Sequence, residues 1–505
     1  MSSLVGLVVV GPLLAAAAGL ACRENQRVRD VITLGGLAAT TAMSVALLVA
    51  VERSGTIVIR VGGWDPELGI VLVADLFAAL ILVVATATIL LVEIYAIGQR
   101  QTAWGADPRL VGPLLLVLTS GVTLAIVTGD LFTLFVAVEL ILISSYVLLT
   151  HQGRRGQIRA GMTYVVMNLF ASALFLFGVA FVYSATGTVN FAHLAERLPE
   201  LSTELRSGIG LWFLVVLGTK AAVFPLFSWL PDSYPTAPTT ITAVFAGLLT
   251  KIGVYSLIRF HTLMSMEDLG PVILTVAGLT MVVGVAGALA QDDVKRILSF
   301  HIISQIGYML MGLGLFSLAG VAGAVLFLVH QIPIKTVLFL VGGLIEESEG
   351  TSALDRVGGL ARRRPGLALL FALPALSLAG LPPFSGFVAK LALIDAGIQE
   401  VSVPIVIVAL GGSVLTLLSM AKIWLGVFWG QPPEPTDPTV APVGSLIATP
   451  LRSLSRGHQL MVVATAATVI LTLAIATAAG PLWELSERAA ASLVDPDLYV
   501  TEVLG

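Results

Sequence analysis

Five lysines lie inside long apolar stretches of the sequence: Lys220, Lys251, Lys335, Lys390 and Lys422. A charged side chain in the middle of a bilayer costs about 2.5–3.5 kcal/mol, so such residues normally face a bundle interior or water. An amine in apolar surroundings also releases its proton more easily than an amine in water. The lysines therefore predict a buried path along which protons are taken up and released.

One acid and one histidine join the lysines. Glu139 has apolar residues on both sides, so it needs a partner from another helix. We expect Lys220 to be that partner, either in a static ion pair or in a gate that releases the lysine's proton when it opens. His330 precedes Lys335 by five residues, and histidine suits a relay because it titrates near neutrality. A plain hydrogen-bonded core histidine is the alternative. Pro333, between the two, is expected to open the helix locally.

The other lysines differ in their expected roles. Lys251 has no nearby acid in the sequence, so we expect it either to exchange protons or to bond to a backbone carbonyl. Lys390 is expected in the first turn of a half-helix, where the helix dipole disfavours the ammonium form. Lys422 lies toward the end of its apolar stretch and is expected to extend to the membrane interface.

Three further polar residues are candidates for lining the path. His301 and Ser304 lie three residues apart, close to one helical turn, and are expected to hold water beside the relay. Asp75, early in an apolar stretch, is expected to anchor a helix or to line an entry.

The elements that position these residues are membrane helices. The 505-residue chain is 57% hydrophobic and 11% charged, whereas a soluble domain carries about 25% charged residues. One core cannot hide this excess, so the surface itself must be apolar and face lipid. The single cysteine, Cys22, excludes an intrachain disulfide, and the absence of a basic patch disfavours nucleic acid. No phosphate, dinucleotide, thiol or haem motif appears, so we expect no cofactor, no metal and no enzyme activity.

Apolar stretches long enough to cross a bilayer recur about fourteen times, which predicts an all-α membrane protein. The first lacks a positively charged region before it, so we expect an uncleaved span and not a signal peptide. Gly129-Asp130 predicts a tight turn between the fourth and fifth. The predicted spans lie near 4–22, 31–51, 70–98, 110–129, 131–150, 159–185, 208–230, 238–260, 270–290, 297–319, 321–344, 366–398, 403–429 and 459–481.

Charges in the loops alternate along the chain. Because positive charge stays on the cytoplasmic side, the arginine-rich set of loops is predicted to be cytoplasmic, and an even number of spans puts both termini outside the bacterial cell membrane. The opposite set is richer in acids but still contains four arginines. The arginine-rich set holds Arg23, Arg27, Arg29, Arg100, Arg109, Arg154, Arg155, Arg159, Lys295, Arg296, Arg356, Arg362, Arg363, Arg364, Arg452 and Arg456.

Two helices are predicted to be broken by proline beside a lysine. Pro225 follows Lys220 in the seventh span, and Pro382 and Pro383 precede Lys390 in the twelfth. Interrupted helices at corresponding places of two halves mark transport sites. The breaks lie five spans apart, which predicts two inverted five-helix units, because an odd number of helices turns the second unit upside down. We assign one membrane domain with three N-terminal helices (1–98), a first unit (110–260), a second unit (270–429), and a cytoplasmic loop with the last helix and tail (430–505).

Two connecting segments have patterns of their own. Residues 56–64 alternate in polarity and end in glycines, which predicts a small hairpin. Residues 431–458 are rich in proline, threonine and serine, which predicts a cytoplasmic loop.

Together these residues resemble the antiporter-like subunits shared by respiratory complex I and the Mrp-type sodium/proton antiporters, over roughly 70–430. Within that family, the stretches 130–148, 183–190 and 229–234 and the chain length resemble the D-type subunit of the Mrp-type complexes most. Lys390 argues against the complex I subunit that carries an acid there, and Pro333 departs from the family pattern. The resemblance rests on Glu139, Lys220 before Pro225, Lys251, the stretch 293–308, His330 with Lys335, and 381–387 ahead of Lys390.

The resemblance implies a fourteen-helix bundle with a hydrophilic axis at mid-membrane. Protons would move between two half-channels, coupled to sodium or another monovalent cation, in a complex with a large A-type subunit and small membrane subunits. An energy-converting subunit of complex I or of a membrane-bound hydrogenase is the first alternative. A non-conducting scaffold subunit is the second, and it predicts that neutralising Lys220 or Lys251 leaves transport intact. The implied axis runs through Glu139, Lys220, Lys251, His330 with Lys335, and Lys390.

Overall fold

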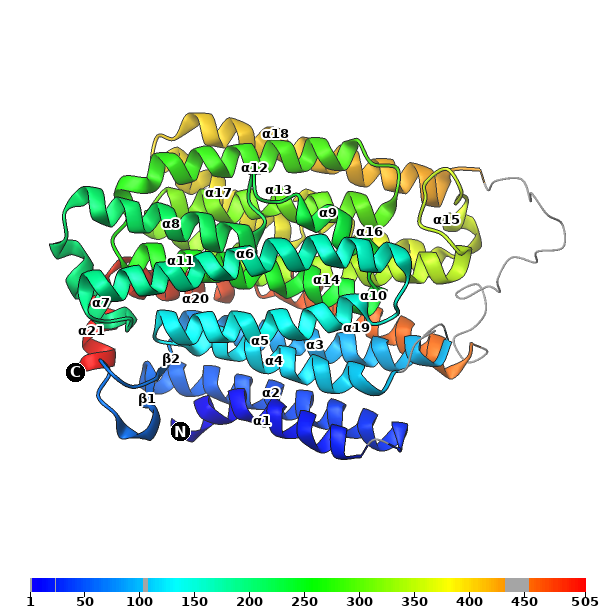
Figure 1. Cartoon of the computed structure of the whole chain (residues 1–505). Helices are drawn as coiled ribbons and strands as arrows, with labels where there is room; N and C mark the ends of the chain where they lie inside the picture. The colour runs from blue at the N-terminus through cyan, green and yellow to red at the C-terminus, as the bar shows by residue number, and fades with distance from the viewer. Residues whose placement is uncertain (1, 23, 103–107, 432–453) are drawn as a thin grey trace.

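The computed structural model describes residues 2–22, 24–102, 108–431 and 454–505, and their helices run nearly parallel in one bundle (Figure 1). The first half forms α1 (Ser2–Ala21), α2 (Gln26–Ser54), α3 (Leu76–Thr102), α4 (Val111–Val127), α5 (Leu131–Thr150), α6 (Arg155–Thr186), α7 (Phe191–Arg197), α8 (Thr203–Ala221), α9 (Trp229–Ser233), α10 (Thr239–Val244) and α11 (Thr250–Leu263). The second half forms α12 (Gly270–Leu289), α13 (Val294–Gly314), α14 (Leu318–Glu349), α15 (Leu360–Arg363), α16 (Pro365–Ala379), α17 (Ser385–Gln399), α18 (Val403–Ile423), α19 (Arg456–Thr477), α20 (Ala479–Val494) and α21 (Pro496–Leu504).

The described helices are those of a membrane protein. Eleven are long and apolar enough to cross a bilayer, and α4 and α16 are shorter apolar helices. The all-α membrane fold is therefore confirmed, whereas the count of fourteen spans stays a prediction. The tight turn at Gly129-Asp130 is also confirmed, because α4 ends at Val127 and α5 begins at Leu131.

Helix α14 lies at the centre of the bundle. It packs against α13, α17, α19 and α20, and its apolar window is fully buried, as is that of α10–α11. A helix that is hydrophobic on all sides belongs in such an interior. In contrast, α1, α2 and α12 keep much of their apolar surface exposed, as expected of helices that face lipid.

The seventh and twelfth spans are broken, as predicted. Helix α8 ends where Ala222 takes a left-handed conformation (φ 63°), just before Pro225. The twelfth span divides into α16 and α17 around Gly380 (φ 87°) and two prolines. The backbone turns sharply at both places, so the lysines beside them stand next to helix ends.

The two predicted five-helix units share a further feature. Asp130 caps the N-terminus of α5 by accepting from Thr133 N (2.6 Å), and Asp293 caps α13 by accepting from Arg296 N (3.0 Å). Each capping aspartate also forms an isolated antiparallel bridge, Asp130 with Asn190 and Asp293 with Ala353. The same cap therefore recurs at the start of the second helix of each unit. The residue bounds that we assign to the units stay a prediction.

A two-stranded hairpin marks one end of the bundle, here called the hairpin end. Strand β1 (Ile57–Arg60) pairs antiparallel with β2 (Val71–Ala74), Ile57 opposite Ala74. The hairpin predicted within 56–64 is thus wrong in extent, because residues 61–70 form a long connection before the return strand. Both chain ends lie at the hairpin end, and α15 lies at the opposite end (Figure 1).

Two C-terminal helices, α20 and α21, were not predicted. Helix α20 is amphipathic and buries Ser486, Ala489, Ala490 and Leu493. Helix α21 is tied to the hairpin by a hydrogen bond from Thr56 Oγ1 to Glu502 Oε2 (2.6 Å). Most of the predicted loop 431–458 lies outside the described residues.

Candidate functional site

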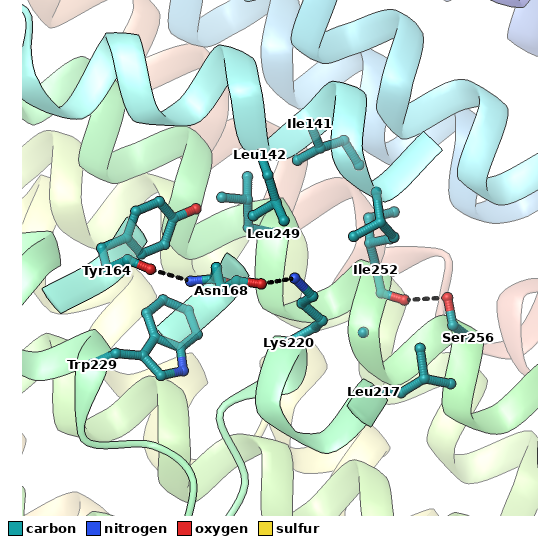
Figure 2. A pocket seen from close by; sticks show the side chains of 12 residues that line it. Ile141, Leu142, Tyr164, Asn168, Leu217, Lys220, Trp229, Leu249, Ile252 and Ser256 are labelled. Carbon is teal, nitrogen blue, oxygen red and sulfur yellow. Dashed lines mark hydrogen bonds between the residues drawn. The ribbon is translucent and has the colours of Figure 1, made fainter. Parts of the chain in front are cut away.

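Lys220 is the second-last residue of α8, next to the first break. The residue is 7% exposed, and its amine donates to Asn168 O at 2.9 Å (Figure 2). It also donates to Ser172 Oγ of α6 at 2.9 Å. The negative end of the α8 dipole also favours a cation there. The amine is thus held by neutral oxygens of a neighbouring helix.

The ion pair expected between Lys220 and Glu139 is not formed in the described structure. Glu139 is only partly buried on α5, and its Oε1 atom has no hydrogen-bond partner among the described residues. The oxygens of Asn168 and Ser172 satisfy the Lys220 amine instead. The static-pair interpretation is therefore wrong for this conformation.

A small cavity borders Lys220. Its volume is about 30 Å³, which is enough for at least one water molecule. Leu142, Asn168, Ile252 and Ser256 are among the residues that surround it (Figure 2). Gly253 keeps this region compact, because a Cβ atom on it would lie 2.6 Å from the backbone nitrogen of Ala221. The end of α8 and the helix that carries Lys251 are thus in direct contact.

Lys251 follows a π-helical turn, Phe245–Leu249. Such turns are rare and often occur at functional sites, because they disturb the regular backbone ladder. The Lys251 amine donates to Ala246 O (2.5 Å), inside that turn, and the residue is 2% exposed. The carbonyl bond that we held as an alternative is present.

His330 and Lys335 are both fully buried on α14. His330 Nδ1 contacts Ser385 Oγ on α17 at 2.8 Å, whereas the Lys335 amine has no hydrogen-bond partner among the described residues. The predicted opening at Pro333 is wrong, because α14 runs unbroken through it. Close packing on all sides of α14 holds the helix together despite the missing backbone donor.

Further polar side chains gather between α13 and α14. Gln331 Nε2 donates to Gln305 Oε1 (3.3 Å), and His301 Nε2 contacts Ser419 Oγ of α18. Within the described structure, Ser304 Oγ and His330 Nε2 are buried without a partner. Buried polar atoms in native proteins are satisfied by protein groups or by ordered water. This region is therefore suited to hold water beside Lys335.

Lys390 is the sixth residue of α17, in its second turn. The predicted first-turn position is therefore wrong. Its amine reaches back across the break to Ala379 O (3.1 Å), the last residue of α16, and lies 4.9 Å from the centre of the Tyr308 ring. A helix C-terminus and an aromatic face both stabilise an ammonium, so these two groups offset part of the cost of burying the Lys390 amine.

The sequence is similar to proteins of a known family. Residues 128–416 match the family model described as NADH:quinone oxidoreductase/Mrp antiporter, transmembrane region. The sequence is 39% identical to the D-type subunit of the Na⁺/H⁺ antiporter of Alkalihalophilus pseudofirmus, over the full length of both chains. The chain belongs to this antiporter family.

Solved structures agree with this family assignment. The fold matches a chain of the Mrp complex from Dietzia sp. DQ12-45-1b with a TM-score of 0.90 and 35% identity, covering 100% of this chain and 99% of that one. It also matches a chain of the archaeal membrane-bound sulfane sulfur reductase, with a TM-score of 0.89 and 26% identity, covering 99% of each. This member of the antiporter family is a multi-pass bacterial membrane protein.

The antiporter-family chain has a polar cavity of about 320 Å³ at the end opposite the hairpin. Its lining includes Gln99, Gln157, Thr239 and Glu346, and Lys295 forms an ion pair with Glu346. Lys422 lies at the same end, where its amine donates to Leu289 O (3.0 Å) and Gln291 O (2.7 Å). This lysine thus stands at the edge of the bundle, where its position in the sequence predicts it.

Sequence reasoning missed two buried ion-pair systems of this antiporter-family chain. Asp75, which we expected to anchor a helix or to line an entry, pairs with Arg259 on α11, and Glu93, fully buried on α3, bonds to Arg100 (2.6 Å). Arg259 and Glu93 are charged residues inside predicted spans, so a count that included arginines and all acids would have found both. Among the described residues, no three His, Cys, Asp or Glu side chains gather as a metal site requires.

Proposed function

We propose that this chain is the proton-carrying subunit of a multisubunit monovalent cation/proton antiporter, a transporter and not an enzyme. One observation carries the proposal. Lys220, Lys251, Lys335 and Lys390 are each at most 7% exposed, and no described carboxylate forms an ion pair with any of them. Buried amines without counter-ions are costly to keep in a membrane, which makes them functional by default.

The pathway would run along the middle of the bundle. Protons would pass from Glu139 and Lys220 to Lys251 through the water-sized cavity beside α8, then to Lys335, His330 and Lys390. His301, Ser304, Gln305 and Gln331 would hold the connecting water. The relatives named as D-type subunits of Na⁺/H⁺ antiporters favour sodium as the coupled cation and other antiporter subunits as partners.

The test is cation-driven proton movement in everted vesicles from antiporter-deficient cells that express the whole complex. Lys251→Ala should abolish sodium-dependent collapse of the pH gradient, while Lys422→Ala, the same change at the edge, should not. Native gels check that both variants assemble. Transport by Lys251→Ala at the wild-type rate would show that this lysine is structural and that the path lies elsewhere.

A second candidate function is proton movement driven by redox chemistry in a respiratory complex. The 26% identity to a chain of the archaeal sulfane sulfur reductase complex favours it. The full-length match at 39% identity to an antiporter subunit favours the first candidate more. An antiporter moves protons in response to sodium without any electron donor, whereas a redox-driven pump does not. Measuring sodium-driven proton movement in the absence of an electron donor therefore separates the two functions.

The hairpin end is proposed to face outward. The alternation of loop charges supports this orientation, and both chain ends lie at that end (Figure 1). In a Cys22→Ser background, an impermeant maleimide added to intact cells should label Trp64→Cys, which replaces an exposed hairpin residue. Arg154→Cys, exposed at the opposite end of the bundle, should react only after the membrane is opened. The reverse pattern would invert the assignment.

A further inference from the structure

A line of polar groups runs from Lys251 toward the hairpin end. Lys251, Tyr255 and Arg259 are four residues apart on α11, so they share one face of the helix. At 1.5 Å per residue, Arg259 lies about 12 Å further along the axis than Lys251. All three residues are at most 4% exposed. None of the relay steps proposed above uses Tyr255 or Arg259.

Arg259 joins this line to Asp75. Its guanidinium contacts both carboxylate oxygens of Asp75, with Nη2 to Oδ1 at 2.9 Å, and also donates to the Tyr255 hydroxyl at 2.8 Å. The Tyr255 hydroxyl itself donates to Ile126 O (2.6 Å). Hydrogen-bonding groups therefore continue from Tyr255, one turn beyond Lys251, to a buried carboxylate at the start of α3.

The C-terminal helix covers the ion pair. The Arg259 guanidinium lies 5.7 Å from the ring centre of Tyr499 on α21, and 5.4 Å from that of Phe77. Tyr499 is 1% exposed. Burial raises the pKa of Tyr499 above its ordinary value, and the charge of Arg259 partly opposes this shift. The turn that carries Asp130 is bonded to the strand that precedes Asp75, because Gly129 N donates to Val71 O (2.8 Å).

Asp130 lies between this buried ion pair and the surface of the hairpin end. It is 4% exposed, and its Oδ2 atom has no hydrogen-bond partner among the described residues. It lines a cavity of about 380 Å³ with Asn190, Tyr183 and the exposed Glu67. Burial raises the pKa of Asp130, so its carboxyl group holds a proton more readily than an exposed aspartate. A proton-exchanging group therefore stands at the wall of an opening on the hairpin end.

We infer that these residues form the branch through which Lys251 exchanges protons with the hairpin-end surface, an inference that rests on the proposed function. An N–H bond of the Lys251 ammonium breaks, and the proton passes through water to the Tyr255 hydroxyl. That hydroxyl, which donates to Ile126 O at rest, turns and gives up its own proton, which forms an O–H bond on Asp75. The proton then leaves Asp75 for Asp130 and the water of the cavity. Arg259 is a positioning residue. Its positive charge favours the ionised form of Asp75, so Asp75 gives up the proton again after each transfer. The Tyr499 side chain separates Asp75 and Arg259 from bulk water.

The experiment replaces the ion pair by a neutral pair of similar shape, Asp75→Asn with Arg259→Gln, in the fully assembled complex. Sodium-driven proton movement is measured in everted vesicles, beside Lys251→Ala, and assembly is checked by native gel. We expect normal assembly and at least a tenfold lower rate. Asp75→Glu, which keeps the carboxyl group, should stay within about threefold of the wild type, whereas a role in packing alone would leave the neutral pair, which keeps the shape, at the wild-type rate.

Tyr255→Phe is the second variant, because it removes only the hydroxyl and keeps the ring stacked on Phe77, with centres 4.4 Å apart. We expect at least a fivefold lower rate. Its matched control is Tyr234→Phe, another buried tyrosine whose hydroxyl donates to a carbonyl, that of Phe245 (3.4 Å). The control should transport normally. If the complex with the neutral pair does not assemble, the transport rate of Tyr255→Phe alone decides whether the proposed branch carries protons.

The outcomes separate this inference from the proposed function. Wild-type rates for the neutral pair or for Tyr255→Phe, with Lys251→Ala inactive, overturn the branch and leave the relay in place. Wild-type transport by Lys251→Ala overturns both. Lower rates in the neutral pair and Tyr255→Phe, with a normal Asp75→Glu and an inactive Lys251→Ala, support both.

Discussion

Adding one methyl group at Gly253 should separate the two helices that carry Lys220 and Lys251. A Cβ atom there would lie 2.6 Å from Ala221 N and 2.9 Å from Ala221 Cα, both backbone atoms, whereas ordinary contact begins at 3.4 Å. The end of α8 must therefore move by about 0.8 Å, at a cost of about 1–3 kcal/mol for overpacking. A displacement near 1 Å in a reacting arrangement lowers rates by about 100-fold. We expect Gly253→Ala to transport 10 to 100 times more slowly.

The assay is the sodium-driven collapse of the pH gradient in everted vesicles, with the amount of assembled complex measured in the same membranes. Gly411→Ala on α18 is the matched control, because a Cβ atom there meets nothing within 4 Å. Alanine favours helix over glycine by about 1 kcal/mol, so this control should be at least as stable as the wild type. Equal transport by the two variants would refute the argument that close approach of α8 and α11 sets the relay geometry.

Three further predictions follow from side-chain contacts. Asp75→Ala leaves the Arg259 charge buried without its partner, so the assembled complex should lose about 3–5 kcal/mol of stability, seen as earlier thermal dissociation in detergent; unchanged melting would contradict it. Lys422→Ala should transport within about twofold of wild type, because its amine bonds only carbonyls and Asp292 at the bundle end; a large loss would place it in the path. Ser385→Ala removes the hydroxyl at 2.8 Å from His330 Nδ1. The assembled complex should lose about 1–3 kcal/mol of stability, measured as earlier thermal dissociation. An unchanged dissociation temperature would show that water replaces the hydroxyl fully.

The membrane helices, the two breaks and the burial of the lysines could be predicted from sequence because each has a local signal. Apolar runs of about 20 residues indicate membrane helices, and proline beside lysine indicates a broken helix in a site. The interruptions before Pro225 and around Pro382 therefore lie where the sequence placed them. Charged residues in apolar helices stand out for the same reason.

The partners of those residues could not be predicted, because they come from distant parts of the chain. Asn168 and Ser172, which hold Lys220, are ordinary polar residues on α6 with no signal of their own. The return of Lys390 to Ala379 O depends on the sharp turn between two helices, which spacing along one helix cannot show. The π-helical turn before Lys251 likewise has no simple residue pattern, since tertiary packing decides it.

The water-sized cavity beside Lys220 has a consequence for selectivity. A proton moves along hydrogen bonds and needs only one bridging molecule, whereas a metal cation must keep its hydration shell or exchange it for several oxygen ligands. A space of about 30 Å³ is too small for a hydrated cation, and only Tyr164, Asn168 and Ser256 of its lining carry side-chain oxygens. Flux of labelled sodium through the purified chain alone would contradict this view. A cavity of this size therefore suits a single bridging water molecule and not a hydrated metal cation.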